Sequence, residues 1–519
     1  MKITKIKLHN FKRFKDIEVS VDPILNMFIG DNESGKSSIL QAIDIVARGS
    51  RTHIEEIGLE RLLNVDVVSD FMAGDRRYEN LPEMYVELYL NDMVNPDLIG
   101  KNNSKGVNCA GIKMHCHIND EYGLHVKTLL ANQASTFPVE FYSVTFDTFA
   151  GEPYNGYNRK LRTLYIDNSN IGSPYSMREY VREVYKAHAD DVKRIELKHA
   201  YHENKLNFQN TKLKIIDVQP YALAIRESVD DNIETAITLT ENDIPIENKG
   251  TGLQCYIKTE LALLRAANGI DTVLLEEPEN HLCYAKMLQL IQKIQNNNDR
   301  QLFISTHSDM IATRLNLKNC ILLNSAKPLP LAFNSISEDT AKFFMKAPDN
   351  NMLQFVLSKK VLLVEGDAEY ILMEALYKRV TGNEITDSGI SVIAVDGKCF
   401  KRYLEIAKVI HVKVAVITDN DGNYQDNIED NYADYMNRQF PNIQVFADSD
   451  NNRYTFEVCI YKENTQTCND LFSSSRRKLS IQDYMLSNKA EAAFKLLSDK
   501  ADVLTVPEYI KNAIEWIDD

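Results

Sequence analysis

Apolar and polar residues alternate over the first thirty residues in a way that predicts three strands. Residues Ile3–Leu8 and 17–21 alternate between the two classes, and residues 26–29 form an apolar run. A glycine-containing turn follows, and apolar positions then recur with helical spacing over residues 37–47. The pattern predicts three strands, a tight turn and a helix.

The segment from residue 51 to 209 has no regular pattern that matches a motif. Stretches rich in asparagine and glycine, at 102–108 and 155–158, are typical of loops. Residues 176–207 carry a rough helical stripe of apolar residues, which begins at a potential helix cap, Ser176. We expect a largely helical insertion here, which either serves assembly and partner contact or forms only a charged surface.

Regular alternation returns after residue 210. Apolar runs at 272–275 and 301–305 predict buried strands, separated by helical patterns. A less regular stretch, 336–358, is predicted to be a connector, and strands and helices alternate again from residue 360. This order predicts an α/β protein with parallel sheets.

The turn after the third strand matches the phosphate-binding pattern G-x-x-x-x-G-K-[ST]. It follows a strand and opens a helix, as the pattern requires. Its glycines let backbone N–H groups surround phosphates, and Lys36 is expected to reach the β and γ phosphates of ATP. Ser37 is expected to hold Mg²⁺. The nucleotide-binding residues predicted in this turn are Gly30, Asn32, Gly35, Lys36, Ser37 and Ser38.

Two later strands end in residues that suit the same nucleotide site. The apolar run 273–275 leads into Glu276 and Glu277. We expect Glu276 near Mg²⁺, and Glu277 to orient or deprotonate the water that attacks ATP. The strand at 301–305 is followed by His307, which can sense the γ-phosphate.

A second glycine-rich helix start lies between these motifs. Gly250, Gly252 and Gln254 open a predicted helix, and a helix N-terminus favours anions. We expect this loop to bind a phosphate presented by another subunit. A plain turn is the alternative.

Acidic residues follow three strands in the second half of the chain, at 361–364, 390–395 and 413–418. The carboxyl ends of neighbouring parallel strands line one crevice, so we expect these acids to converge. Oxygen ligands without histidine favour Mg²⁺ or Mn²⁺, and two such ions about 4 Å apart stabilise the reacting oxygens of a phosphodiester. The predicted metal ligands are Glu365, Glu369, Asp396, Asp419 and Asp421.

Composition restricts the class of protein. A chain of 519 residues is too long for one ordinary core, and 44% hydrophobic with 26% charged residues fits a globular protein. No apolar run approaches the ~20 residues that span a bilayer. The first residues also lack the apolar core of a secretory signal, so we expect a cytoplasmic protein without membrane contact.

The net charge of −15 argues against a protein that coats nucleic acid, although local basic strips can still contact DNA. The candidate strips are Lys2, Lys5, Lys7, Lys12, Arg13 and Lys15, then Lys398, Lys401 and Arg402, then Arg476, Arg477 and Lys478. None of the eight cysteines forms a CxxC pair, so reduced thiols are expected. The run from His115 to His117 lacks the second ligand pair that a zinc site needs.

The nucleotide motifs, in this order, resemble the ABC-type ATPases of the SMC and RecF kind, and the opening ITKIKLHNFKRFKDIEV resembles the N-terminal strand of that group. The resemblance implies that two ATPase heads enclose ATP, with residues 250–254 as the signature loop of the second subunit. At least a homodimer is therefore expected. Glu276 departs from the aspartate that most such ATPases carry, which leaves the rate of hydrolysis open.

The pattern VEGxxE followed by DxD resembles a Toprim domain. Joined behind an ABC-type ATPase, it resembles the OLD (overcoming lysogenisation defect) family of nucleases. The resemblance adds Glu457 as a metal ligand, Lys489 as a catalytic lysine beside Glu365, and Asp396 as support for a second metal. It implies an ATP-regulated DNA endonuclease or nickase that uses ATP and Mg²⁺ (or Mn²⁺).

The same resemblance implies a role in bacterial anti-phage defence, in some members beside helicases and in others beside retron reverse transcriptases. A defence-system partner, protein or nucleic acid, is therefore expected. Two alternatives stay open. One is an ATP-switched DNA-binding or sensing protein whose Toprim site is silent. The other, a topoisomerase, would need a nucleophilic tyrosine on a separate DNA-gripping domain.

The expected organisation combines the motifs and the patterns. An ABC-type ATPase domain is formed by 1–50 and 210–335, with the insertion at 51–209 between its parts. The connector 336–358 leads to a Toprim nuclease domain with a Rossmann-like parallel sheet at 359–470, and 471–519 form a C-terminal helical extension.

Overall fold

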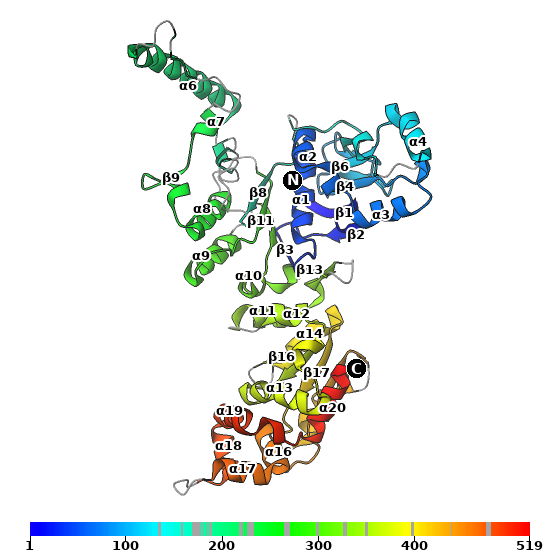
Figure 1. Ribbon diagram of the computed structural model, residues 1–519, viewed down its shortest axis with the longest axis vertical. Coiled ribbons are helices and arrows are strands. Elements are labelled where there is room, and N and C mark those ends of the chain that lie inside the picture. The colour runs from blue at the N-terminus through cyan, green and yellow to red at the C-terminus, as the bar shows by residue number, and fades with distance from the viewer. Residues whose placement is uncertain are drawn as a thin grey trace. The chain divides into compact units, whose positions relative to one another are not determined.

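The computed structural model describes residues 1–519 except 133–135, 157–158, 169–177, 179, 183, 186–188, 217–220, 222, 226–232, 264–269, 297–299, 325–329, 348–350, 396–398, 437–438 and 474–478. The chain forms two compact units (Figure 1). The first contains Met1–Ile311 and Asn319–Pro330, and the second contains Ala312–Lys318 and Leu331–Asp519. In the part of the chain that is described, no helix is both long and apolar enough to cross a membrane.

An antiparallel sheet forms one layer of the first unit. Its strand order is β2-β1-β4-β6-β5, and β7 also pairs with β6. The strands are β1 (Ile3–Phe11), β2 (Phe14–Ser20), β4 (Met84–Leu90), β5 (Ile99–Gly100), β6 (Cys109–Ile118) and β7 (Tyr142–Thr148). On β1, Ile6 and Leu8 are buried while Lys7 between them is partly exposed, so the alternation in the sequence marks one covered face.

A parallel sheet of order β13-β3-β12-β11-β8 forms the other layer. Its strands are β3 (Leu25–Gly30), β8 (Thr163–Asp167), β11 (Thr272–Glu276), β12 (Gln301–Ser305) and β13 (Cys320–Leu323). Every residue of β3, β11 and β12 is buried, which is typical of parallel strands covered on both faces. Helix α1 (Lys36–Arg48) contacts strands of both sheets and belongs to the core between them.

The other elements of the first unit are short strands and helices outside these sheets. They are α2 (Arg51–Ile57), α3 (Val65–Ala73), α4 (Gly123–Ala131), α6 (Asp191–Thr211), α7 (Ile233–Ala236), β9 (Thr240–Glu241), β10 (Ile244–Pro245), α8 (Thr251–Leu263) and α9 (Tyr284–Gln295). Helix α10 (Asp309–Arg314) follows β12. The cap that we predicted, Ser176, lies outside the described residues, and Asp190 caps α6 by accepting a hydrogen bond from the Lys193 N–H.

The segment 51–209 differs from the largely helical insertion that we expected. It supplies β4 to β8, and these strands pair with β1 and with β11, so the segment completes both sheets. On β4, every residue except Tyr85 is buried, and two of its positions are the tyrosines Tyr85 and Tyr89. Tyrosine is partly apolar, so it hides the alternation that would have predicted a strand.

The second unit is built on a parallel sheet of order β16-β15-β17-β18. The strands are β15 (Lys360–Val364), β16 (Ile390–Ala394), β17 (Lys413–Ile417) and β18 (Ile443–Phe446). Its helices are α11 (Glu338–Lys346), α12 (Met352–Leu357), α13 (Asp367–Thr381), α14 (Phe400–Ile410), α15 (Ala433–Met436), α16 (Phe456–Glu463), α17 (Thr465–Phe472), α18 (Ile481–Ser487), α19 (Lys489–Lys500) and α20 (Glu508–Asp518). A short β14 (Leu331–Ala332) precedes them.

The C-terminal helices are part of the core of the second unit. Helix α19 packs against α13, and α20 contacts β17 and β18. Ile510, Ile514 and Ile517 of α20 are fully buried in a cluster with residues of α13 and the sheet. This packing brings α19, at its first residue Lys489, to the carboxylate cluster described below.

Candidate functional site

The turn between β3 and α1 has the shape of a phosphate-binding loop. Gly35 has a φ of 98°, which L side chains rarely adopt, and a Cβ there would lie 2.3 Å from the ring of Phe14. Lys36 is 6% exposed, and its Nζ donates to the carbonyl oxygens of Gly30 and Asp31, each at 2.8 Å. Burial lowers the pKa of Lys36 to about 8.

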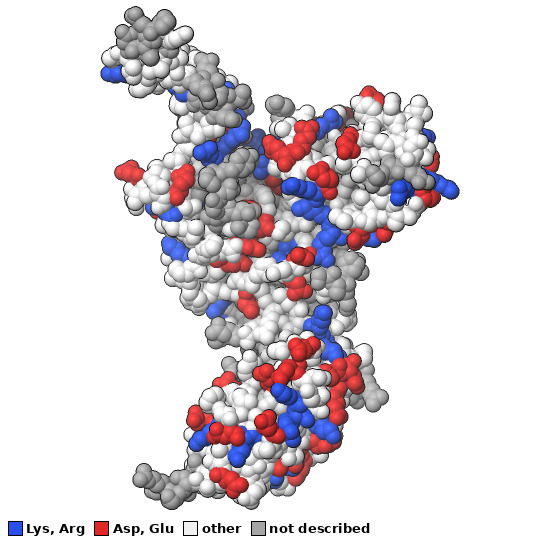
Figure 2. Space-filling model, in the orientation of Figure 1, with Lys and Arg blue, Asp and Glu red and all other residues white. Residues whose placement is uncertain are grey.

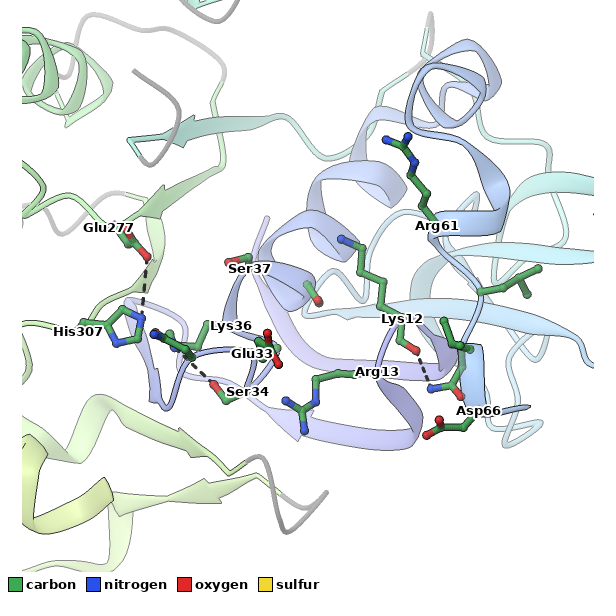
Figure 3. Close-up of a pocket in the computed structure, with 16 residues that line it drawn as sticks. Lys12, Arg13, Glu33, Ser34, Lys36, Ser37, Arg61, Asp66, Glu277 and His307 are labelled. Atoms are coloured by element: carbon green, nitrogen blue, oxygen red, sulfur yellow. Dashed lines mark hydrogen bonds and ion pairs between the residues drawn. The ribbon is translucent and has the colours of Figure 1, made fainter. Parts of the chain in front are cut away.

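A cavity of about 790 Å³ lies beside this loop (Figure 3). The predicted residues in its wall are Asn32, Gly35, Lys36, Ser37, Ser38, Glu277 and His307. Lys12, Arg13 and Arg61 also line it, together with Glu33 and Asp66. The cations beside the loop suit a polyanion. We had assigned Lys12 and Arg13 only to a basic strip, and no sequence signal marked Arg61.

Glu276 ends β11 and is 6% exposed. Its carboxylate accepts hydrogen bonds from Ser37 and from the hydroxyl of Tyr165 on β8. Burial raises its pKa, and the nearby Asp167 and Glu277 add to the rise. The predicted pair of Ser37 and Glu276 therefore lies together, and Tyr165 is a neighbour that the sequence did not reveal.

Glu277 and His307 follow the carboxyl ends of the paired strands β11 and β12. Glu277 has a φ of 45°, its N–H donates to Ser305 O, and its carboxylate accepts from Asn280 Nδ2 at 2.6 Å. His307 Nε2 lies 3.9 Å from Glu277 Oε1 (Figure 3). Burial and the charge of Lys36 lower the pKa of His307, so the imidazole is neutral near pH 7.

Glu279 is a further residue of this region that the sequence did not single out. Its Oε1 accepts from Thr306 Oγ1 at 2.6 Å and from the His307 N–H at 2.8 Å. Its other oxygen, Oε2, is buried without a hydrogen-bond partner. Glu279 therefore fixes the loop that carries His307.

Gly250, Gly252 and Gln254 lie at the start of α8. Gln254 is 8% exposed and donates to the carbonyl oxygen of Lys249 at 2.7 Å, which fixes the turn. A Cβ at Gly252 would lie 2.1 Å from the His281 carbonyl oxygen. These three residues are not among those that line the cavity beside Lys36.

In the second unit, parallel pairing of β15 and β17 brings two of the predicted acids together. Glu365 follows β15 and Asp419 follows β17, and the Asp419 N–H lies 3.4 Å from Glu365 Oε2. Asp419 Oδ1 accepts from the Phe456 N–H at 2.8 Å, which places the start of α16 beside it. Glu369, in the first turn of α13, is 5% exposed.

Glu457 and Lys489 lie beside these acids. Lys489 Nζ lies 3.1 Å from Glu457 Oε1, and Glu457 Oε2 is buried without a hydrogen-bond partner. Burial, and then the charges of Glu365, Glu369 and Glu457, raise the pKa of Asp419 to about 8. Burial and its acidic neighbours raise the pKa of Glu369 to about 7. We define the carboxylate cluster as these four acids.

An all-oxygen donor set with an unpartnered buried oxygen fits a hard divalent cation. Among the described residues, no three His, Cys, Asp or Glu side chains are already arranged to hold a metal ion. The acids would therefore have to move toward one another on binding.

Two other predicted ligands remain predictions. Asp421 lies on an exposed turn with a φ of 50°, and its N–H donates to the Tyr454 carbonyl oxygen. Asp396 lies outside the described residues. Asn420, between the two aspartates, is 1% exposed and donates to the carbonyl oxygen of Asp448, which holds the turn in place.

Two family models match the chain. Residues 356–421 match the Toprim domain of proteins like the overcoming lysogenization defect protein. Residues 1–106 and 166–312 match an AAA ATPase domain. The two matches contain the carboxyl ends of β15 and β17 and the loop before α1, respectively.

Curated relatives match parts of the chain. The Old nuclease of Escherichia phage P2 is 27% identical over 176 residues, which cover 32% of this chain and 30% of that protein. The DNA replication and repair protein RecF of Stenotrophomonas maltophilia is 45% identical over 49 residues, or 9% of this chain and 14% of RecF. The chain thus spans less than a third of the length of each of these two relatives.

Solved structures give more distant matches. An SMC head bound to the C-terminal winged-helix domain of ScpA covers 64% of this chain with 14% identity and a TM-score of 0.36, and 99% of that head is matched. The C-terminal region of the Burkholderia pseudomallei OLD protein covers 31% of this chain with 20% identity and a TM-score of 0.25, and 97% of that region is matched.

Proposed function

We propose that this chain, which is an OLD-like protein with an AAA/ABC-type ATPase part and a C-terminal OLD-like Toprim domain, is an ATP-regulated, divalent-metal-dependent DNA endonuclease. The observation that carries the proposal is the carboxylate cluster. Its acids come from four different elements, yet burial, and then the charges of the other three acids, raise the pKa of Asp419, and Lys489 is the nearby cation. Perturbed acids gathered in this way are typical of catalytic sites.

The carboxylate cluster suits phosphodiester hydrolysis. A divalent metal bound there would offset the negative charge that builds on the phosphodiester. Glu365, Glu369, Asp419 and Glu457 would hold it, with Asp421 and Asp396 as further candidates. Lys489 would stabilise charge on the reacting phosphate, because its carboxylate neighbours, against the effect of burial, raise its pKa and keep it protonated.

The nucleotide cavity suits control by ATP. Lys36 would move from its loop carbonyls to the β and γ phosphates, and Ser37 with Glu276 would hold Mg²⁺. Glu277 would orient the attacking water, and neutral His307 would contact the γ-phosphate.

The loop of Gly250, Gly252 and Gln254 would close the site from a second copy of the chain. We therefore propose at least a homodimer that ATP tightens. Light scattering at several protein concentrations, with and without ATP, tests this, and a monomer under every condition would contradict it.

A nicking assay tests the proposed reaction. Supercoiled and linear plasmid are incubated with Mg²⁺ or Mn²⁺, with and without ATP, and with wild type or Asp419→Asn. We expect metal-dependent cutting by wild type alone. Equal cutting by both proteins would mean that the carboxylate cluster takes no part in the reaction. No cutting by wild type, with DNA binding retained, would favour the ATP-switched sensing protein.

We extend the proposal to a role as an effector of bacterial anti-phage defence, with a retron as one candidate partner. The match to the phage P2 Old nuclease and the joined ATPase and Toprim parts support it. Phage plating on cells that express wild type or Asp419→Asn tests it. Equal plating on both would contradict the role.

A further inference from the structure

A second cavity in the Toprim unit has the charge and lining of a phosphate-binding groove. It measures about 570 Å³ and lies along one face of α14. Lys401, Arg402 and Lys408 line it, together with the rings of Phe343 and Tyr435. We call it the α14 groove. It lies apart from the acids of the carboxylate cluster, which do not line it.

Two cations of the α14 groove have no acidic partner among the described residues. Arg402 donates to Thr340 Oγ1 at 3.0 Å, and its charge helps to lower the pKa of Glu405, a carboxylate in the lining. Glu405 also accepts from the Ser337 N–H at 2.5 Å. Among the ion pairs of the described residues, neither Lys401 nor Lys408 has a carboxylate partner.

Both lysines are instead held by aromatic rings. Lys401 Nζ lies 5.6 Å from the centre of the Tyr432 ring. Lys408 Nζ lies 4.5 Å from the centre of Tyr435 and 4.4 Å from that of Phe440. A cation over a ring face keeps its full charge, so both ammonium groups stay available to an anion.

The α14 groove starts at the edge of the sheet from which Glu365 and Asp419 emerge. Helix α14 begins after β16, the strand next to β15, so Lys401 lies at the edge of the sheet where Glu365 lies. Burial, and then the charge of Glu365, raise the pKa of Tyr432 to about 12, and the ring of Tyr432 lies beneath Lys401. Tyr432 therefore connects Glu365 of the carboxylate cluster with Lys401 of the α14 groove.

The spacing of the two lysines and the aromatic lining suit a single strand. Lys401 and Lys408 are seven residues apart on one helix, or about 10 Å along its axis, so they can contact two phosphates of one strand. Aromatic rings beside cations are typical of sites that bind single strands by stacking.

We propose that the α14 groove binds the phosphodiester backbone of a single DNA strand and leads it to the carboxylate cluster. The proposal rests on the proposed nuclease function for its choice of DNA. Lys401 and Lys408 contact two phosphates, and the partly exposed ring of Phe343 contacts a base beside them.

Binding without metal tests the groove separately from cutting. Fluorescence anisotropy in EDTA measures the affinity of the full chain for a labelled single strand over a series of salt concentrations. For Lys401→Gln/Lys408→Gln we expect affinity about tenfold lower at low salt, and a salt slope smaller by about 1.4, since each phosphate contact on a single strand contributes ~0.7. Lys511→Gln, an exposed lysine on α20, is the matched control and keeps wild-type binding.

The outcomes separate the two proposals. If the double variant keeps wild-type affinity and salt slope, the proposal that the α14 groove binds DNA is wrong, whether or not wild type cuts DNA. An equal loss with a blunt duplex, or tighter binding of RNA than DNA, would overturn its assignment to single-stranded DNA. If the double variant loses binding as expected but wild type does not cut DNA in Mn²⁺, the α14 groove is supported and the proposed nuclease function is contradicted. Phe343→Leu, which keeps both charges, should weaken binding without changing the slope.

Discussion

The nucleotide cavity and the carboxylate cluster differ in how far their charged groups are neutralised within the chain. Lys36 already donates to two carbonyl oxygens, and Glu279 already accepts two hydrogen bonds. In the cluster, burial and the charges of neighbouring acids raise the pKa of Asp419 to about 8 and that of Glu369 to about 7.

This difference shows how each site depends on its ligand. The phosphate loop keeps its shape by backbone contacts and by the conformation of Gly35, so its geometry exists before a nucleotide binds. The carboxylate cluster lacks a comparable set of donors. Its acids repel one another unless a cation or protons enter, so its geometry depends on what it binds.

The strongest test of the comparison is to disable one site alone. We expect Asp419→Asn to lower DNA cleavage by about a thousandfold or more, since loss of a metal ligand costs several kcal/mol of transition-state stabilisation. ATP hydrolysis should stay within about twofold of wild type. A nicking time course and a phosphate-release assay on one preparation measure both. A parallel fall in ATPase activity would show that the two sites are not separable.

Glu277→Gln tests the nucleotide site alone. We expect ATP hydrolysis to slow by about a hundredfold, in the range that general bases contribute, with ATP affinity close to wild type. The amide keeps the shape of the side chain but loses the basic oxygen. Steady-state ATPase assays and nucleotide titration check it. Unchanged hydrolysis would mean that another group acts as the base, and Glu276 is the neighbouring candidate.

Lys36→Met asks whether the preformed loop binds nucleotide without its cation. We expect ATP affinity to fall by about a hundredfold, because a charged hydrogen bond to each of two phosphates is lost at ~1.5–3 kcal/mol for each. Isothermal titration measures it, with Lys511→Met as the control. Retained affinity would mean that Lys12, Arg13 or Arg61 supplies the charge.

The smallest expected effect concerns stability and pH. The folded-state pKa values of Asp419 (about 8) and Glu369 (about 7) exceed the ordinary values near 4. The folded protein therefore holds protons that the unfolded chain releases, and stability falls as pH rises from about 4 through 8. In EDTA, the melting temperature should be a few degrees lower at pH 8.5 than at pH 6, and Mn²⁺ should restore most of it. The melting temperature of Asp419→Asn should fall less between these two pH values. An equal fall in both proteins would contradict repulsion between the acids of the carboxylate cluster.

The sequence predicted the strand ends well, because each site residue there follows a buried apolar run. Glu276, Glu365 and Asp419 all occupy such positions, and parallel pairing of β15 with β17 then brings Glu365 and Asp419 together. Glu457 and Lys489 were placed by resemblance, since each follows from how a distant helix packs. No local pattern indicates such packing.

Residues from irregular segments could not be predicted. Arg61 lies in a short helical turn between α2 and α3, and Tyr165 lies on β8, within the segment that we expected to be largely helical. Glu279 was visible in the run after β11, but its hydrogen bonds to the His307 loop depend on how β11 and β12 pair. The α14 groove depends on a helix face and a remote ring, which spacing in the sequence does not connect.

Tyr165 limits how this chain can be rebuilt by grafting. Its hydroxyl donates to Glu276, so a chimera that exchanges residues 51–209 would also exchange a neighbour of the acid expected to face Mg²⁺. A breakpoint placed just before β8 keeps Tyr165 with its own Glu276, whereas one placed after β8 separates them. A donor segment with phenylalanine at that position would leave a buried carboxylate short of one donor.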